Sequence, residues 1–269
     1  MSGAATRVGA MSEERAWRRG GSGVEGNVRT AAVWSQVREL SESRRSELGR
    51  PLRVLDLGGG TGGLAVALAE QGHTVTVVDP SPDALASMGR RVAESDAAER
   101  ISSVQGDADT LAGIVAPGSI DLLCCHGTLE YVEDPEATLT RIAEVLAPGG
   151  HLSLVTAQRV AAVIARALAG RFDQARAALT APDGRWGEED PVPRRFDRAA
   201  LAEMLTRTGF TARETRGVRI FSDFVPSTFV DTEADRQALL ELEALASADA
   251  GRTGLSALGG AVHLVARRD

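Results

Sequence analysis

The chain of 269 residues lacks lysine altogether, and it contains only two cysteines, few aromatic residues and no long apolar run. Because aromatic side chains make up only 4% of the residues, the core must be built from aliphatic side chains. No apolar run approaches the ~20 residues that span a bilayer, and charged residues stand near the N-terminus, where a secretory signal would be apolar. These absences argue against a membrane protein and predict a cytoplasmic one.

Cysteine and histidine are too few and too scattered to indicate a metal centre. Cys124 and Cys125 are neighbours in an expected strand, where consecutive side chains point to opposite faces, so we do not expect them to form a disulfide with each other. The histidines lack the i,i+4 or Cys-x-x-Cys spacing that places ligands on one face. They are His73, His126, His151 and His263. The sequence predicts no metal site.

Because lysine is absent, every basic side chain is the planar, permanently charged guanidinium of arginine. The net charge of −7 hides a gradient along the chain. Residues 51–150 contain 5 arginines and 15 acidic residues, whereas residues 1–50 contain 9 and 6, and residues 151–220 contain 12 and 8. An acidic centre between two basic flanks is compatible with a polyanionic partner despite the acidic total.

The composition, with 43% hydrophobic and 25% charged residues, is that of a globular chain. We expect a flexible N-terminal segment at 1–25 and one domain at 26–269 with an insertion at 157–195. Apolar patterning predicts helices at 27–44, 64–70, 83–93, 135–146, 160–179, 198–208 and 231–248, and strands at 52–57, 74–78, 101–104, 120–125, 151–155, 211–221 and 261–266. This alternation predicts an α/β fold with a doubly wound, seven-stranded, mostly parallel sheet, in which ligands bind at the carboxyl ends of the strands.

A glycine-rich segment directly follows the first expected strand and opens the next helix. Glycine permits positive φ and close approach of the backbone to a ligand, and the helix N-terminus offers free N–H groups. Gly58, Gly60 and Gly63 satisfy the G-x-G-x-x-G pattern of dinucleotide-binding proteins. Asp56 and Gly62 join the first two of these glycines in the acidic-x-G-x-G-x-G pattern of S-adenosylmethionine-binding proteins. By itself the segment does not distinguish the two cofactors, and a glycine turn without a ligand is a third interpretation.

Two acidic positions further along the chain fit a bound nucleoside. Asp79 ends the second strand about twenty residues after the glycines, where a carboxylate accepts hydrogen bonds from the ribose of either cofactor. Asp107, Ala108 and Asp109 follow the third strand, where backbone groups and a carboxylate can hold an adenine. A solvated loop carboxylate is the alternative at this second position.

The segment between the fourth and fifth strands indicates which of the two candidate cofactors the chain binds. It contains His-Gly-Thr-Leu-Glu-Tyr at 126–131, an Asp-Pro helix start at 134–135 and a Leu-Ala-Pro-Gly-Gly turn at 146–150. Over residues 52–155 this arrangement resembles the class I S-adenosylmethionine-dependent methyltransferases. The resemblance implies a Rossmann-like methyltransferase fold with a helical insertion after strand five, and S-adenosyl-L-methionine as the cofactor.

Flanking motifs resemble a narrower family, the tRNA 5-carboxymethoxyuridine methyltransferases. They are Gly-Asn-Val-Arg-Thr-Ala-Ala-Val-Trp at 26–34, Pro-Arg at 193–194, Gly-Val-Arg-Ile-Phe-Ser-Asp at 217–223 and Ala-Leu-Leu-Glu-Leu-Glu at 238–243. This resemblance implies a tRNA substrate as partner. It also implies cofactor contacts at Arg29, Gly58, Gly59, Asp79, Ala108, Asp109 and His126, to which the glycine pattern adds Asp56, Gly60 and Gly62.

On the same resemblance, His126 and Arg219 are the candidate catalytic residues, and Arg194, Arg219 and Tyr131 are the candidates for substrate binding. Arg29 can form a bidentate pair with the methionine carboxylate of the cofactor. His126 contacts the amino-acid end of the cofactor, faces the acceptor, or merely packs over the ligand. The arginines that can pair with an acceptor carboxylate are Arg194 and Arg219.

The chain departs from the family pattern at 180–190, where a polar loop replaces a lysine-rich run. The lost positive charge weakens any phosphate contact made there. The arginines that can compensate, each with a solvated surface position as its alternative, are Arg194, Arg195, Arg198, Arg216 and Arg219.

The expected reaction is an in-line displacement at a sulfonium methyl group, for which alignment in a dry pocket is the main task of the protein. A carboxylate acceptor is ionised at neutral pH and needs no general base. The first hypothesis is therefore a methyltransferase acting on the carboxyl group of a tRNA wobble uridine. The alternative is a small-molecule O- or N-methyltransferase, in which residues 158–195 form a lid and Tyr131, Glu130 or His126 is the base. A non-enzymatic S-adenosylmethionine-binding regulator is the third hypothesis.

Overall fold

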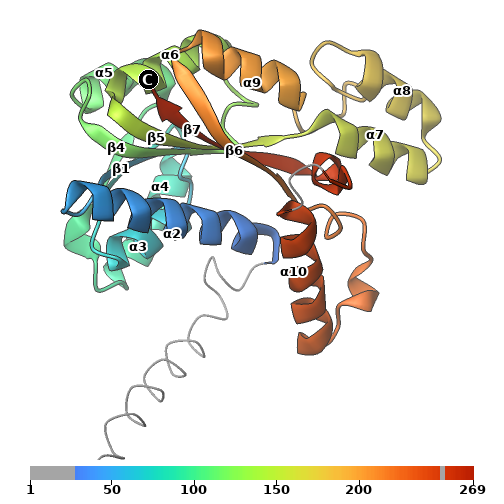
Figure 1. Ribbon diagram of the computed structural model, residues 1–269, viewed down its shortest axis with the longest axis horizontal. Coiled ribbons are helices and arrows are strands. Elements are labelled where there is room, and N and C mark those ends of the chain that lie inside the picture. Colours follow the sequence, from blue (N-terminus) through green and yellow to red (C-terminus); the bar gives the residue numbers. More distant parts are fainter. Residues whose placement is uncertain (1–27, 249–251) are drawn as a thin grey trace, which may run out of the picture.

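The computed structural model describes residues 28–248 and 252–269, whose strands form a seven-stranded sheet in the order β3-β2-β1-β4-β5-β7-β6 (Figure 1). Neighbouring strands are parallel except at β7, which is antiparallel to both β5 and β6. The strands are β1 (Arg53–Leu57), β2 (Thr74–Asp79), β3 (Ile101–Gln105), β4 (Ile120–His126), β5 (Leu146–Ala157), β6 (Phe210–Val218) and β7 (Ala261–Arg268). The doubly wound, mostly parallel sheet is confirmed, and all of these strands except β7 end at the same edge.

Helices cover both faces of this sheet (Figure 1). They are α2 (Val28–Leu48), α3 (Gly63–Glu70), α4 (Pro82–Ala93), α5 (Leu111–Ile114), α6 (Pro135–Val145), α7 (Arg159–Leu168), α8 (Phe172–Thr180), α9 (Arg198–Arg207) and α10 (Glu233–Ser247). Because strand side chains alternate between faces, one core joins the sheet to α5, α6 and α9, and the other joins it to α2, α3 and α4. Cys124 and Cys125 follow this alternation, since they are free, buried and belong to opposite cores.

Helix starts are set by the side chains that precede them. Ser81 accepts from the backbone N–H of Ala84 at the start of α4, and Asp134 accepts from the N–H groups of Glu136 and Ala137 at the start of α6. Both helices have proline in their first turn, where its missing N–H costs nothing. These caps place α4 directly after β2, and α6 after the segment that follows β4.

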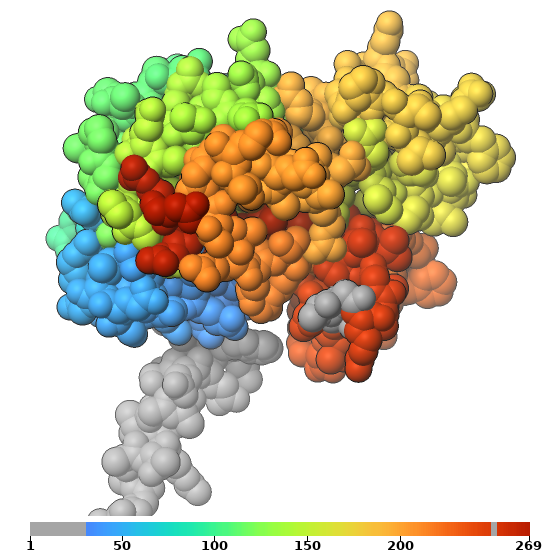
Figure 2. Space-filling model, turned by 45° about the horizontal axis from the view of Figure 1, so that its top comes forward, coloured from blue at the N-terminus to red at the C-terminus, as the bar shows by residue number. Residues whose placement is uncertain are grey.

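The insertion after β5 differs from the expected single helix at 160–179. It consists of two helices, α7 and α8, because Gly170 between them adopts a positive φ of 69° that ends the first helix. Its yellow residues form a lobe at one side of the molecule (Figure 2). The strand expected at 211–221 ends earlier, at Val218, since Arg219 has a φ of 58° that is incompatible with an extended chain.

Other boundaries shift without changing the topology. β5 begins at Leu146 rather than at His151, because Leu146 already pairs with Ile120 before the glycine turn. The leading helix expected at 27–44 continues to Leu48. The flexible segment expected at 1–25 lies outside the described residues.

Candidate functional site

The glycine turn between β1 and α3 has the backbone shape that the sequence predicts. Gly58, Gly60 and Gly62 have φ angles of 74°, 56° and 74°, a conformation that side-chain-bearing residues rarely adopt. The N–H of Gly58 donates to the carbonyl of Val78 at 2.7 Å. A Cβ at Gly58 would lie 2.0 Å from the Oγ1 of Thr128, so glycine is required there for packing as well as for φ.

Asp79 fastens this turn to the end of β2. Its carboxylate is 7% exposed and accepts from the N–H of Gly60 at 2.8 Å and from the N–H of Ser81 at 2.9 Å. The carboxylate therefore lies beside the glycine turn at a strand end, the position at which a nucleoside ribose is held in such folds.

Asp56 lies beneath the turn with one oxygen unpartnered. The residue is 3% exposed, and within the described residues its Oδ2 has no hydrogen-bond partner. Burial, assisted by the nearby negative charge of Asp79, raises the pKa of Asp56 to about 7. A Cβ at Gly59 would lie 2.5 Å from this Oδ2, so only glycine fits directly above the buried oxygen. An orphaned carboxyl below a cradle of glycines fits a ligand that carries cationic or hydrogen-bond-donating groups.

The segment after β3 places Ala108 and Asp109 differently. Ala108 is 4% exposed, whereas the side chain of Asp109 is 71% exposed and pairs with Arg141 at 2.9 Å. Asp107 orders the turn, because its carboxylate accepts from the N–H groups of Asp109 and Thr110. The carboxylate of Asp109 is thus open to solvent at this strand end.

His126, at the carboxyl end of β4, is held by residues that the sequence did not indicate. Its Nε2 lies 2.8 Å from the Oγ of Ser153, and the same oxygen lies 2.8 Å from the Nε2 of His263. Burial lowers the pKa of His126 to about 4, so the ring is neutral at pH 7. Ser153 and His263 lie on β5 and β7. That their side chains meet His126 can be found only once the order of the strands in the sheet is known.

The arginines proposed to bind the acceptor already have partners within the protein. The Nε of Arg219 lies 3.2 Å from the Oδ2 of Asp223, and both side chains are about one third exposed, at 31% and 30%. Arg194 donates to the carbonyls of Val132 and Glu133 at 2.8 and 3.3 Å, so it braces the segment after β4.

Tyr131 and Glu130, which follow β4, differ sharply in exposure. Tyr131 is 65% exposed. Glu130 is 5% exposed, and its Oε1 accepts from the N–H of Ala157 at 2.6 Å. Its Oε2 has no partner among the described residues, and burial raises the pKa of Glu130 although Arg219 and Arg195 oppose this effect.

The segment that follows β6 and carries Arg219 is tied down by α10. The buried carboxylate of Glu243 accepts from the N–H groups of Ile220, Phe221 and Ser222, at 2.8 to 2.9 Å, and from the Ser222 hydroxyl at 2.6 Å. α10 therefore fixes the direction in which the chain leaves β6.

Two more of the predicted arginines, Arg29 and Arg195, differ in what the structure shows of them. Arg29 lies in the first turn of α2, but its side chain is outside what the structure describes. Arg195 is not a surface arginine, because it forms a buried bidentate pair with Asp190 at 2.6 and 3.0 Å. Asp190 also accepts from the N–H of Trp186, whose ring stacks on Arg166 with its centroid 4.0 Å from the guanidinium carbon. These contacts order the loop of the insertion.

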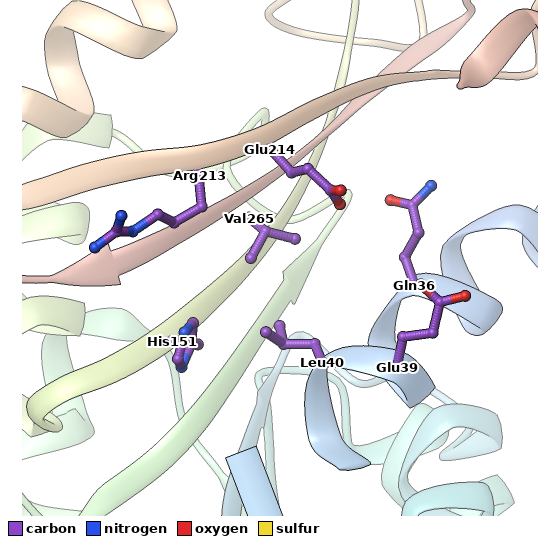
Figure 3. Close-up of a pocket in the computed structure, with 7 residues that line it drawn as sticks. All are labelled: Gln36, Glu39, Leu40, His151, Arg213, Glu214 and Val265. Atoms are coloured by element: carbon purple, nitrogen blue, oxygen red, sulfur yellow. The ribbon is translucent and has the colours of Figure 1, made fainter. Parts of the chain in front are cut away.

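A groove of about 320 Å³ lies away from this site, between α2 and the β5, β7 and β6 part of the sheet. Figure 3 shows Gln36 and Glu39 reaching into it from α2, with Glu214 opposite on β6. His151 lines it four residues before Val155, the partner of His126 in the sheet, so the groove is displaced from the carboxyl ends of the strands. None of the predicted site residues lines it.

Within residues 28–248 and 252–269, no three His, Cys, Asp or Glu side chains are grouped as metal ligands, and none of the helices combines the length and the apolar composition of a membrane span.

Comparisons with known proteins identify the architecture. Residues 32–215 match the methyltransferase domain family. The tRNA 5-carboxymethoxyuridine methyltransferase of Escherichia coli K12 is 30% identical over 220 residues, covering 81% of each chain. A ubiquinone biosynthesis O-methyltransferase of Xanthomonas campestris is 39% identical over 122 residues, covering 44% of this chain and 48% of that protein. A crystal structure of an S-adenosylmethionine-dependent methyltransferase from Mesorhizobium loti superposes with a TM-score of 0.58 at 23% identity, covering 91% of this chain and 100% of that one.

Proposed function

The chain belongs to the methyltransferase domain family of class I, S-adenosylmethionine-dependent enzymes, and on this premise we propose that it methylates the carboxylate of 5-carboxymethoxyuridine at the tRNA wobble position. The product is a methyl ester. The observation that carries the proposal is the similarity to the tRNA-modifying enzyme, which extends over 81% of both chains and therefore includes the segments outside the shared cofactor-binding half. A tRNA substrate implies that the enzyme acts in the cytoplasm.

The described residues fit the cofactor. Gly58, Gly59 and Asp56 provide the cradle and the orphaned carboxyl oxygen, and Asp79 lies where a ribose is bound. We assign the adenine to the segment of Ala108 and Asp109 after β3, and the methionine carboxylate to Arg29. When bound, S-adenosylmethionine supplies an electrophilic methyl group on a sulfonium.

The site residues support a carboxylate nucleophile. His126 is hydrogen-bonded to a serine and not to a carboxylate. With a pKa of about 4, it is a poor general base at neutral pH. An acceptor carboxylate is already ionised and has no proton to lose. The protein therefore needs to orient the acceptor and exclude water, and it has no proton to remove.

Arg219 is the proposed orienting residue for the acceptor. It follows β6, whose carboxyl end lies at the same sheet edge as that of β4, and its guanidinium is shared with Asp223 at 3.2 Å. The sharing matters because a cation that paired too tightly with the acceptor would lower its nucleophilicity. Tyr131, which is 65% exposed, is available to contact the nucleoside.

A second candidate function is small-molecule O- or N-methylation. Two observations favour it: the similarity to the ubiquinone biosynthesis enzyme, and Glu130, whose unpartnered Oε2 and raised pKa suit a buried general base for a hydroxyl or amine acceptor. In this alternative, α7 and α8 form the lid over the acceptor.

Incubation with radiolabelled S-adenosylmethionine distinguishes the two proposed functions by showing which substrate becomes labelled. We expect label to enter bulk tRNA that carries 5-carboxymethoxyuridine, and not tRNA that lacks the carboxymethoxy group. Label that enters a protein-free small-molecule extract, with none in either tRNA, contradicts the tRNA proposal and supports the second function.

A further inference from the structure

Three polar side chains form a continuous hydrogen-bonded row across the sheet behind the proposed cofactor site. His126, Ser153 and His263 come from β4, β5 and β7, which are adjacent strands, with Ser153 Oγ 2.8 Å from the Nε2 atom of each ring. Ser153 and His263 are 0% and 1% exposed. The two rings also contact edge to face, with centroids 5.9 Å apart and planes at 77°. The backbones of these residues pair within the sheet, but that pairing does not require the hydrogen bonds between their side chains, so the buried polar side-chain atoms need another explanation.

The number of protons restricts how the row can be wired. The serine hydroxyl has one proton, and among the described residues the two imidazole nitrogens are its only hydrogen-bond partners. It therefore places its proton on one nitrogen and accepts from the N–H of the other. If it donated to His263, the proton of that ring would sit on Nδ1, which is buried and has no partner among the described residues. Because an orphaned buried N–H is costly, we assign the opposite direction: His263 Nε2–H donates to Ser153, and Ser153 donates to His126 Nε2.

This direction fixes the free side of His126. With Nε2 acting as acceptor, the proton of the neutral ring must lie on Nδ1. His126 is partly exposed at the end of β4, so this Nδ1–H is the polar group that the ring offers to a bound ligand. Burial lowers the pKa of His263, assisted by His126 and by Arg216, its partner in the sheet register, and this keeps the inner ring neutral.

We propose that Ser153 and His263 are positioning residues that lock His126 as the Nδ1–H tautomer, so that it donates a hydrogen bond to a carboxylate of a bound ligand. Two ligands in the proposed reaction carry such a group: the cofactor, at its amino-acid end, and the acceptor. The inference rests on the proposed placement of the cofactor at this strand end but not on the identity of the acceptor.

The test combines histidine NMR with ligand binding for Ser153→Ala, Ser153→Thr and Thr156→Val. Thr156→Val is the matched control, because Thr156 is buried on the same strand and its hydroxyl has no partner among the described residues. His73 is an internal reference, since its Nδ1 accepts from the N–H of Leu52 at 3.1 Å and its proton must lie on Nε2. Long-range ¹H–¹⁵N spectra of the protein report each tautomer.

In the wild type and in Thr156→Val we expect His126 to show the Nδ1–H pattern, opposite to that of His73. Ser153→Ala mixes the two tautomers of His126 and weakens S-adenosylhomocysteine binding about tenfold, the size of one lost hydrogen bond to a charged group. Ser153→Thr keeps the hydroxyl, so we expect this variant to show the Nδ1–H tautomer of His126 and the S-adenosylhomocysteine affinity of the wild type. Binding of methylthioadenosine, which lacks the carboxylate, is unchanged in every variant.

If the acceptor supplies the carboxylate, S-adenosylhomocysteine binding stays constant and KM for tRNA rises about tenfold instead, a result that also supports the proposal. An Nε2–H tautomer in the wild type overturns it. So does a Ser153→Ala protein with unchanged His126 tautomer and unchanged binding. Since the spectra and the cofactor binding require no tRNA, a failure of the tRNA function is distinguishable from a failure of this inference.

Discussion

At the scale of single residues, the site is marked by carboxyl groups that the fold buries without fully satisfying. Asp56 and Glu130 each retain one oxygen with no partner among the described residues. A buried polar group without a partner destabilises the folded state, and beside a binding site a ligand can complete the hydrogen bonding of such an atom. Both lie next to strand ends, and this agrees with the placement of the cofactor and the acceptor at that edge.

Asp56 makes stability depend on pH. The folded protein holds its proton up to pH of about 7, whereas the unfolded chain releases it near the ordinary value of 3.8. The free energy of unfolding therefore falls as pH rises through this window, by up to about 4 kcal/mol for about three pKa units. Asp56→Asn lacks this dependence, so its stability relative to wild type increases from pH 4.5 to pH 8 in urea titrations without cofactor. Asp96→Asn, at an exposed position, is the control, and parallel profiles for wild type and Asp56→Asn would contradict the assignment.

Arg219 is expected to act on the acceptor alone. Arg219→Ala lowers kcat/KM for tRNA by about a hundredfold, because a charge-assisted contact to the acceptor carboxylate is lost. Its affinity for S-adenosylmethionine, measured by calorimetry, stays within twofold of wild type. Arg213→Ala removes an exposed arginine of the same strand that lies at the distant groove, and it leaves both values unchanged. Equal losses of cofactor affinity and activity in Arg219→Ala would show that this residue belongs to the cofactor site.

At the scale of elements, the turn between β1 and α3 combines a backbone requirement with a packing requirement. Gly72 has a φ of 92° with nothing within 4 Å of a built Cβ, so Gly72→Ala carries only the conformational cost of about 1–2 kcal/mol. Gly58→Ala carries a similar cost and also displaces Thr128 from its 3.1 Å bond to the Leu57 carbonyl. We expect only Gly58→Ala to reduce cofactor affinity, by about tenfold or more, in calorimetry of both variants. Equal affinities would contradict this role of the turn.

The parts of the fold that the sequence predicts are those with local signals. The apolar strands, their alternation with helices and the glycine turn are each contained within a few neighbouring residues, and all three are confirmed. The apolar pattern does not predict the break between α7 and α8, because it continues across Gly170 and periodicity carries no information about a single positive φ.

The hydrogen-bonded row behind His126 could not be predicted for a different reason. Ser153 and His263 are 110 residues apart in the chain, and they meet only because β7 inserts beside β5 in an antiparallel direction. The ion pair between Arg219 and Asp223 and the unpartnered oxygen of Asp56 likewise depend on side-chain directions that local patterns do not fix.

At the scale of the whole molecule, much of the positive charge of the basic segment 151–220 is already neutralised within the protein. Ion pairs join Arg159 to Asp197, Arg195 to Asp190, Arg207 to Glu136, Arg216 to Glu214, and Arg219 to Asp223. Arg194 donates to backbone carbonyls. These five arginines are thus paired with carboxylates of the same chain, which makes them less available to phosphate groups than unpaired guanidinium groups would be.

This charge pattern predicts weak salt dependence. Because these arginines are paired with carboxylates, we expect recognition of the proposed tRNA substrate to depend on the modified nucleoside more than on the phosphate backbone, and few counterions to be released on binding. Between 50 and 200 mM salt, the slope of log KM against log salt concentration is expected to be about 3 or less, which corresponds to about four phosphate contacts. A slope of about 6 or more would indicate an extensive phosphate-binding surface that the paired arginines do not provide.

The chemistry of the product tests the account most directly. Wobble-modified tRNA is incubated with the enzyme and S-adenosylmethionine, digested to nucleosides and analysed by mass spectrometry before and after mild alkali. We expect 5-carboxymethoxyuridine to be converted to a nucleoside heavier by one methylene, which alkali returns to the starting mass because the methyl group is held as an ester. A methylated product that survives alkali, or no methylated nucleoside from a protein that binds the cofactor, would contradict it.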